Sequence, residues 1–202
     1  MQIKSAKIIS ILFHPLLMPL LGIITIFKSG TYISYIDNRW VNITLLIVFI
    51  LTVVLPLSIT PFYYYTRIVR SIRMESHKER IIPYFITFAL FYVAHLIIKK
   101  LPLNYFYSVY LFAASISVLM VIIISYFWKI STHMVGIGGL IGLILSLSLR
   151  MTANLMGILI ITLIVAGILG TSRLKLNSHS PSQVYSGFIL GFFSIVIFCL
   201  FF

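Results

Sequence analysis

The feature of this sequence that most constrains its fold is a series of long apolar runs separated by short polar stretches. The runs cover about residues 7–27, 41–65, 83–98, 105–128, 132–149, 152–171 and 181–202. A helix of about 20 apolar residues crosses the hydrocarbon core of a bilayer, so each run is a candidate membrane span. Only helices and closed barrels satisfy the backbone hydrogen bonds inside a bilayer, and continuous apolar runs indicate helices, because barrel strands are short and alternate.

Composition supports this interpretation, because the chain is 61% hydrophobic and only 9% charged. A soluble protein of this length has too little interior to bury that much apolar surface. We therefore predict an all-α fold, a polytopic transmembrane helix bundle with about six to seven membrane segments. The chain, residues 1–202, is expected to form a single integral membrane domain. We expect its location to be a bacterial inner (cytoplasmic) membrane.

Three local signals refine the bundle. Pro15 and Pro19 lie inside the first run and predict a kinked or broken helix, because proline lacks the N–H that helix continuation needs. Ser180-Pro181 is typical of a helix cap followed by a first helical residue, and Thr132 is a second candidate cap. Small residues allow helices to approach closely, and this is expected of two glycine clusters, Gly136, Gly138, Gly139 and Gly142, and Gly157, Gly167 and Gly170.

Seven crossings would put the N-terminus and the connections around 66–82, 129–131 and 172–180 on one side of the membrane. That side holds ten lysines and arginines and the other side five, which by the positive-inside rule would make it cytoplasmic. Five of the ten, however, are candidates for binding phosphate: Arg73, Lys78, Arg80, Lys129 and Arg173. Cations that serve chemistry carry no topological signal, so the count does not assign an orientation.

These three connections each carry at least one cation and a histidine. They read RSIRMESHKERIIP (70–83), KISTHM (129–134) and SRLKLNSHSPSQV (172–184). The net charge of +12 in a chain that is mostly lipid-embedded favours anionic lipid head groups over nucleic acid as the partner. Polar residues gathered on one face of a membrane bundle indicate a functional site, here an anion site at the membrane boundary.

The motifs in these connections resemble those of the type 2 phosphatidic acid phosphatase superfamily, which includes the lipid phosphate phosphatases and the vanadium haloperoxidases. That family carries Lys-x6-Arg-Pro, Pro-Ser-Gly-His and Ser-Arg-x5-His-x3-Asp. The third motif is matched by Ser172-Arg173, His179 and Gln183 at the family spacing, and the second in part by Ser131-Thr132-His133. The first is matched loosely by Arg73 and Arg80, with Ile81 at the proline position.

The resemblance implies a chemistry for these residues. His179 would be the nucleophile that forms a phosphohistidine, and His133 would protonate the leaving oxygen and later activate water. Gln183 would orient His179, and the phosphoryl oxygens would be bound by Arg73, Lys78, Arg80, Ser131 and Arg173. The resemblance implies no metal and no cofactor. The implied function is hydrolysis of a lipid phosphomonoester or pyrophosphate, on an anionic lipid or polyprenyl phosphate, with no nucleic acid as partner.

One departure leaves the alternatives open. Gln183 stands where the family has aspartate, and an amide can orient an imidazole but supplies no negative charge to stabilise an imidazolium. A non-catalytic lipid-phosphate binding or transport protein on the same fold is therefore the main alternative. An unrelated ion-coupled transporter is disfavoured, because the three carboxylates, Asp37, Glu75 and Glu79, all lie outside the apolar runs.

The other histidines receive structural interpretations. His95 lies within an apolar run and is expected to be a hydrogen-bonded interior residue. His14 precedes Pro15 and is expected to satisfy backbone groups freed by the break, within reach of the site. His77 is expected to be a solvated loop residue.

Overall fold

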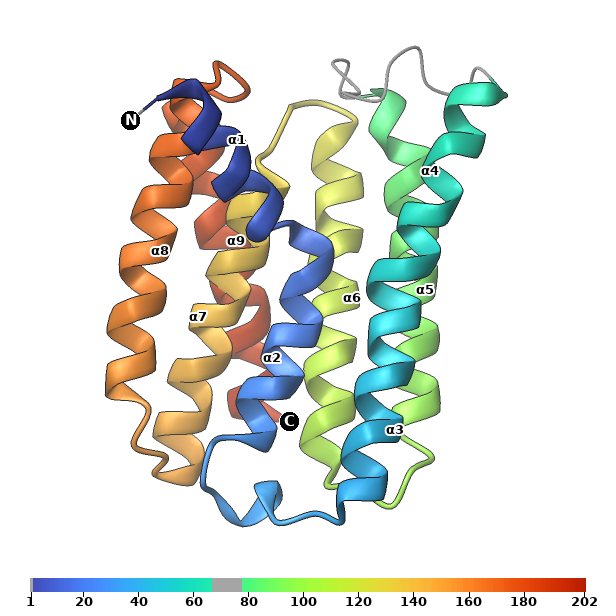
Figure 1. Cartoon of the computed structure of the whole chain (residues 1–202), viewed down its shortest axis with the longest axis vertical. Coiled ribbons are helices and arrows are strands. Elements are labelled where there is room, and N and C mark those ends of the chain that lie inside the picture. The colour runs from blue at the N-terminus through green and yellow to red at the C-terminus, as the bar shows by residue number, and fades with distance from the viewer. Residues whose placement is uncertain (1, 67–77) are drawn as a thin grey trace.

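The computed structural model describes residues 2–66 and 78–202, and in these residues the chain forms a bundle of helices without strands (Figure 1). Seven helical stretches of this part are long and apolar enough to cross a membrane. They are Ile3–Phe27, Asn38–Tyr63, Ile81–Ile98, Tyr105–Ser125, Thr132–Met151, Met156–Lys175 and Pro181–Phe201. The prediction of an all-α membrane bundle is confirmed.

Two of the spans are built from shorter elements. The first contains α1 (Ile3–Leu12), the 3₁₀-helix η1 (Pro15–Leu17) and α2 (Met18–Phe27), and the second contains α3 (Asn38–Phe49), the π-helical η3 (Ile50–Val54) and α4 (Leu55–Tyr65). The short helix η2 (Tyr32–Ser34) lies between these spans. The remaining elements are η4 (Lys78–Arg80), α5 (Ile81–Ile98), α6 (Tyr105–Ser125), α7 (Thr132–Met151), α8 (Met156–Lys175) and α9 (Pro181–Phe201).

The predicted break of the first span is confirmed. In an unbroken helix the backbone N–H of His14 would donate to the carbonyl of Ser10, but it donates instead to the carbonyl of Ile11, at 3.2 Å. Pro15 has no N–H with which to continue the helix. The Nδ1 atom of His14 accepts from the backbone N–H of Leu16 at 3.4 Å, which confirms that His14 satisfies backbone at the break. The carbonyl of Ser10 is thereby left to bond a group outside α1.

The centre of the bundle is formed by α6 and α7. Twelve of the 20 residues of α7 and 13 of the 21 residues of α6 are buried, whereas α5, α8 and α9 bury five residues each. Lipid-facing helices expose one apolar side to the bilayer, so the difference identifies α6 and α7 as the helices that the others surround. His95 lies in the last turn of α5 and is buried. Its Nδ1 bonds the carbonyl of Ser108 at 2.8 Å, as expected for an interior histidine.

Helix α9 packs against α7 along a seam of glycines. A Cβ atom at Gly142 would lie 2.7 Å from the carbonyl oxygen of Phe192, and one at Gly187 would lie 2.6 Å from that of Ser131. At Gly138 and Gly191 a Cβ would meet the carbonyl oxygens of the facing helix more closely still. The two backbones therefore approach to a distance that only glycine permits.

The glycine predictions are confirmed only in part. Gly138 and Gly142 mediate close packing, but a Cβ at Gly157 or Gly167 would meet nothing within 4 Å, so the prediction is wrong for those two. Gly157 and Gly167 lie on α8 where it faces away from other helices. The seam is completed instead by Gly187 and Gly191 of α9, which the sequence interpretation did not single out.

The two predicted helix starts have different outcomes. Ser180 caps α9 as predicted, because its Oγ accepts from the backbone N–H of Gln183 and Pro181 is the first helical residue. The prediction for Thr132 is wrong, because Thr132 is already helical and the cap position of α7 belongs to Ser131. The backbone N–H of Ser131 donates to the carbonyl of Gln183 at 3.3 Å, so the starts of α7 and α9 are joined directly.

Candidate functional site

The α6–α7 and α8–α9 connections and the N-terminus lie at one end of the bundle (Figure 1). A cavity of about 450 Å³ is lined by residues of this end. Its histidine and arginine lining residues come from five separate parts of the chain. They are His14, Arg80, His133, Arg173 and His179. The described parts of the three polar connections therefore contribute to one cavity rather than to separate surface patches.

His179 is held by Gln183, four residues later. The Oε1 atom of Gln183 lies 3.1 Å from Nδ1 of His179 and 3.2 Å from the backbone nitrogen of Ser180. A backbone N–H only donates, so the side-chain atom facing both groups is the amide oxygen, and Nδ1 of His179 must carry the proton. The lone pair of this imidazole is therefore on Nε2. The bond to Gln183 fixes the ring in the tautomer that a nucleophile or a base requires.

His133 is held by a hydrogen bond to α1. Its Nε2 lies 3.0 Å from the carbonyl oxygen of Ser10, the group that the helix break leaves available. A carbonyl oxygen only accepts, so Nε2 carries a proton and the free nitrogen of the ring is Nδ1. That Nδ1 atom is buried and has no hydrogen-bond partner within residues 2–66 and 78–202.

Two further buried polar atoms near the start of α7 and the end of α8 share this property. They are Oγ of Ser131 and Nε of Arg173, neither of which has a partner among the residues that the structure describes. An unpaired buried polar group costs about 1–3 kcal/mol, so such atoms are uncommon in folded proteins. The N–H of Arg173 and the hydroxyl of Ser131 can donate to an oxyanion, whereas Nδ1 of His133 can accept the hydrogen of a protonated phosphate oxygen.

The electrostatics at His179 favour its neutral form. Burial, and next the positive charge of Arg173, lower the pKa of His179 to about 4, while the bond to Gln183 acts in the opposite direction. Arg80 and Lys129 lower the pKa further. Asp37 caps α3 at the other end of the bundle, and Glu79, which precedes Arg80 in η4, is not among the groups that shift the pKa of His179. At neutral pH the site thus combines an uncharged imidazole with several cations, an arrangement suited to an anion.

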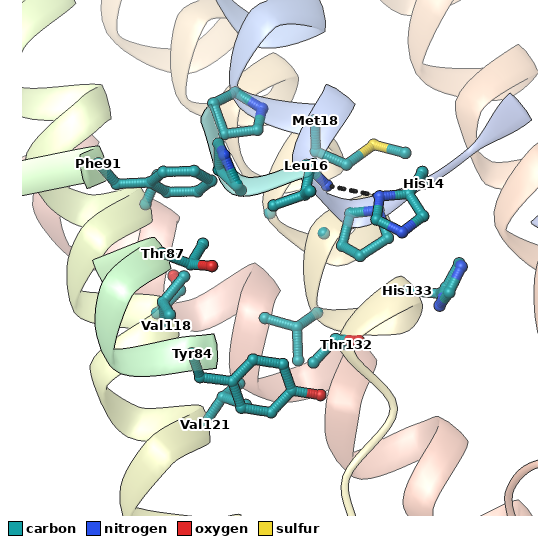
Figure 2. A pocket seen from close by; sticks show the side chains of 18 of the residues that line it. His14, Leu16, Met18, Tyr84, Thr87, Phe91, Val118, Val121, Thr132 and His133 are labelled. Carbon is teal, nitrogen blue, oxygen red and sulfur yellow. Dashed lines mark hydrogen bonds between the residues drawn. The ribbon is translucent and has the colours of Figure 1, made fainter. Parts of the chain in front are cut away.

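The cavity continues from this polar end into an apolar region. Figure 2 shows His14 and His133 on one side of the cavity and Phe91, Thr87 and Val118 on the other. On α6 the lining runs from Tyr110 to Val121, which at 1.5 Å per residue is roughly 16 Å of helix. This depth is about half of the ~30 Å hydrocarbon core of a bilayer. The shape suits a ligand with an anionic end and an apolar chain.

The predicted site residues have the following positions. Arg80, His133, Arg173 and His179 line the cavity, while Gln183 and Ser131 lie behind it at the joined starts of α9 and α7. Arg73, the side chain of Lys78 and His77 lie outside the described residues. Among those that are described, no group of three or more histidine, cysteine, aspartate or glutamate side chains is placed to hold a metal ion.

Sequence reasoning missed Ser10 as part of the site. Besides its carbonyl bond to His133, its Oγ accepts from Nη1 of Arg173 at 3.2 Å. The available signal was weak: a serine in an apolar run, four residues before the His14-Pro15 break. His14 itself contacts His133 edge to face, with ring centroids 5.6 Å apart.

No family model, no curated protein and no solved structure matches this chain.

Proposed function

We propose that this protein is a membrane-embedded phosphatase that hydrolyses a lipid phosphomonoester or pyrophosphate through a histidine nucleophile. The observation that carries the proposal is the setting of His179, whose Nδ1–H is bound by Gln183 and whose Nε2 is left with the lone pair. The same cavity is lined by Arg80, His133 and Arg173. A nucleophile, an acid–base group and an anion clamp are the parts that metal-independent phosphoryl transfer requires.

The proposed reaction has two steps. In the first, the bound phosphate monoanion gives its proton to Nδ1 of His133, Nε2 of His179 forms a bond to phosphorus while the bond between phosphorus and the lipid oxygen breaks, and that oxygen takes the proton from Nδ1. In the second, Nδ1 of His133 takes a proton from water, the water oxygen bonds to phosphorus, and the P–N bond breaks with its electron pair returning to Nε2. Inorganic phosphate then leaves with the proton held on Nδ1, which restores both histidines to their neutral forms. Throughout, the arginine guanidinium groups neutralise the charge on the phosphoryl oxygens.

The shape of the cavity supports a lipid as the substrate. A water-soluble phosphate would not fill an apolar extension lined by residues such as Phe91 and Val118. The chain of a lipid phosphate would occupy it, and apolar contact would stabilise the bound lipid. Phosphatidate, phosphatidylglycerol phosphate, polyprenyl pyrophosphate and phosphorylated lipid A all have the required chemistry. The proposal places the enzyme in a bacterial inner membrane.

A second candidate function is binding or transport of the same lipids without turnover. It is favoured by one observation: the group that holds His179 is a neutral amide, which offers no negative charge to an imidazolium while three cations disfavour its formation. A site of this kind can hold a phosphate without reacting with it.

The deciding experiment is incubation of the purified protein with radiolabelled lipid phosphates, followed by alkaline quenching to trap phosphohistidine. The phosphatase proposal expects phosphate release and labelled protein, both lost in His179→Ala and both retained in EDTA. His95→Gln is the matched control, because His95 is a buried histidine outside the cavity. Tight lipid binding without release would favour the binding function, and loss of activity in EDTA that a divalent ion restores would reject the histidine mechanism.

A further inference from the structure

We propose that Ser10 of α1 is a positioning residue of the site, which orients His133 through its backbone carbonyl and Arg173 through its hydroxyl. The inference rests on the proposed function, and it adds a segment that none of the three histidine-bearing connections contains. Ser10 is only 7% exposed and is one of the two buried residues of α1.

The carbonyl of Ser10 is available because of the helix break. The N–H of His14, its regular partner, donates to Ile11 instead, and the freed carbonyl oxygen lies 3.0 Å from Nε2 of His133. This bond persists whether His133 is neutral or protonated, because Nε2 carries a hydrogen in both states. It therefore leaves Nδ1 as the nitrogen that exchanges protons in the cavity, and it orients the ring for that exchange.

The hydroxyl of Ser10 acts on the second group. Its hydrogen is donated to the carbonyl of Ala6 at 2.9 Å, so its oxygen is free to accept, and Nη1 of Arg173 donates to it at 3.2 Å. The guanidinium is anchored at one nitrogen, while its Nε has no partner among the described residues. Anchoring one edge of the fork orients the remaining N–H groups, which lowers the entropy lost when they bind an anion.

The test uses inorganic phosphate as the probe and measures its Kd by calorimetry in detergent. Ser10→Ala removes the acceptor for Arg173 but retains the carbonyl, so phosphate affinity should fall about 10-fold, the effect of one hydrogen bond to a charged group. Ser10→Thr keeps the hydroxyl and should restore affinity to within about threefold. Ser146→Ala is the matched control, since Ser146 is also buried and also bonds the carbonyl four residues earlier.

A double-mutant cycle separates positioning from a general effect on packing. If Ser10 acts through Arg173, Ser10→Ala should change phosphate affinity by less than about twofold in an Arg173→Gln background. An unchanged Kd in Ser10→Ala, or the same loss of affinity with and without Arg173, would overturn the inference. Should Ser10→Ala not fold, Ser10→Cys keeps the volume with a weak acceptor and carries the same expectation.

Parallel assays of phosphate release from a lipid phosphate distinguish the two proposals. Wild-type protein that binds phosphate but releases none rejects the phosphatase, and the Kd values still decide the role of Ser10. Turnover with no effect of Ser10→Ala on Kd rejects the positioning role alone. Wild-type protein that neither binds phosphate nor hydrolyses the lipid rejects both.

Discussion

The amide oxygen of Gln183 accepts two hydrogen bonds, from Nδ1 of His179 at 3.1 Å and from the backbone N–H of Ser180 at 3.2 Å. Replacement by glutamate keeps the length of the side chain, both bonds and the capping of α9, and adds one negative charge. An opposite charge at this distance raises the pKa of a histidine by about one to three units. From its value of about 4, the pKa of His179 should rise to between about 5 and 7 in Gln183→Glu.

Replacement by leucine has the opposite consequence. Gln183→Leu removes both bonds, but only the bond to His179 orients the nucleophile. Its loss of about 1 kcal/mol corresponds to a roughly fivefold loss of kcat/KM, and loss of control over the tautomer adds to this. Aspartate is one methylene shorter than glutamine and reaches His179 less well, so glutamate is the better test of charge alone.

The assay is the dependence of kcat/KM on pH, over about pH 3 to 9, for phosphate release from a lipid phosphate in detergent. The acidic limb of this profile reports protonation of the nucleophile in the free enzyme. In the wild type it should lie near pH 4, and in Gln183→Glu it should move upward by about one to three units, while activity at pH 8 holds or rises. An acidic limb that does not move, or equal activity of Gln183→Leu and wild type at matched expression, would refute this role for Gln183.

Two further predictions concern stability, measured as the midpoint of thermal unfolding in detergent. The pKa of His179 in the folded state, about 4, lies below the ordinary value of 6.5. The unfolded state therefore binds the proton first, and the stability of the folded state should fall as the pH drops from about 6.5 towards 4. His179→Gln should flatten this part of the profile, and an unchanged slope would contradict the lowered pKa. Gly191→Ala should destabilise the protein by about 1–3 kcal/mol, because its Cβ would meet the Val135 carbonyl. Gly157→Ala is the control and should not destabilise the protein, because Gly157 faces open space. Equal unfolding midpoints for the two variants would contradict the close packing of α7 and α9.

The parts of the fold that the sequence predicted are those set by local chemistry. The missing N–H of Pro15 ends α1, and the Ser180-Pro181 pair begins α9 in any surroundings. Helix spans follow from the apolar runs, because lipid imposes the same length on every crossing. Thr132 failed as a cap because Ser131 precedes it, a choice between adjacent residues that local preference does not resolve.

The parts that could not be predicted depend on contacts between residues far apart in the chain. Ser10 reaches His133 and Arg173 across more than a hundred residues, and only the packing of α1 brings them together. Likewise, the predicted Gly157 and Gly167 face open space, whereas Gly187 and Gly191 face α7. A glycine in a helix has the same local signature whether or not another backbone lies beside it, so composition alone does not distinguish the two cases.

The glycine seam of α7 and α9 sets the distance between the two parts of the site that carry His133 and His179. His133 stands at the start of α7 and His179 just before α9, and the carbonyl of Gln183 is bonded to the backbone of Ser131. The spacing of these histidines is thus set by backbone against backbone, with no long side chain in between. We therefore expect substitutions on the lipid-facing sides of the bundle to leave the distance between the two histidines unchanged, and a single methyl added at the seam to change it.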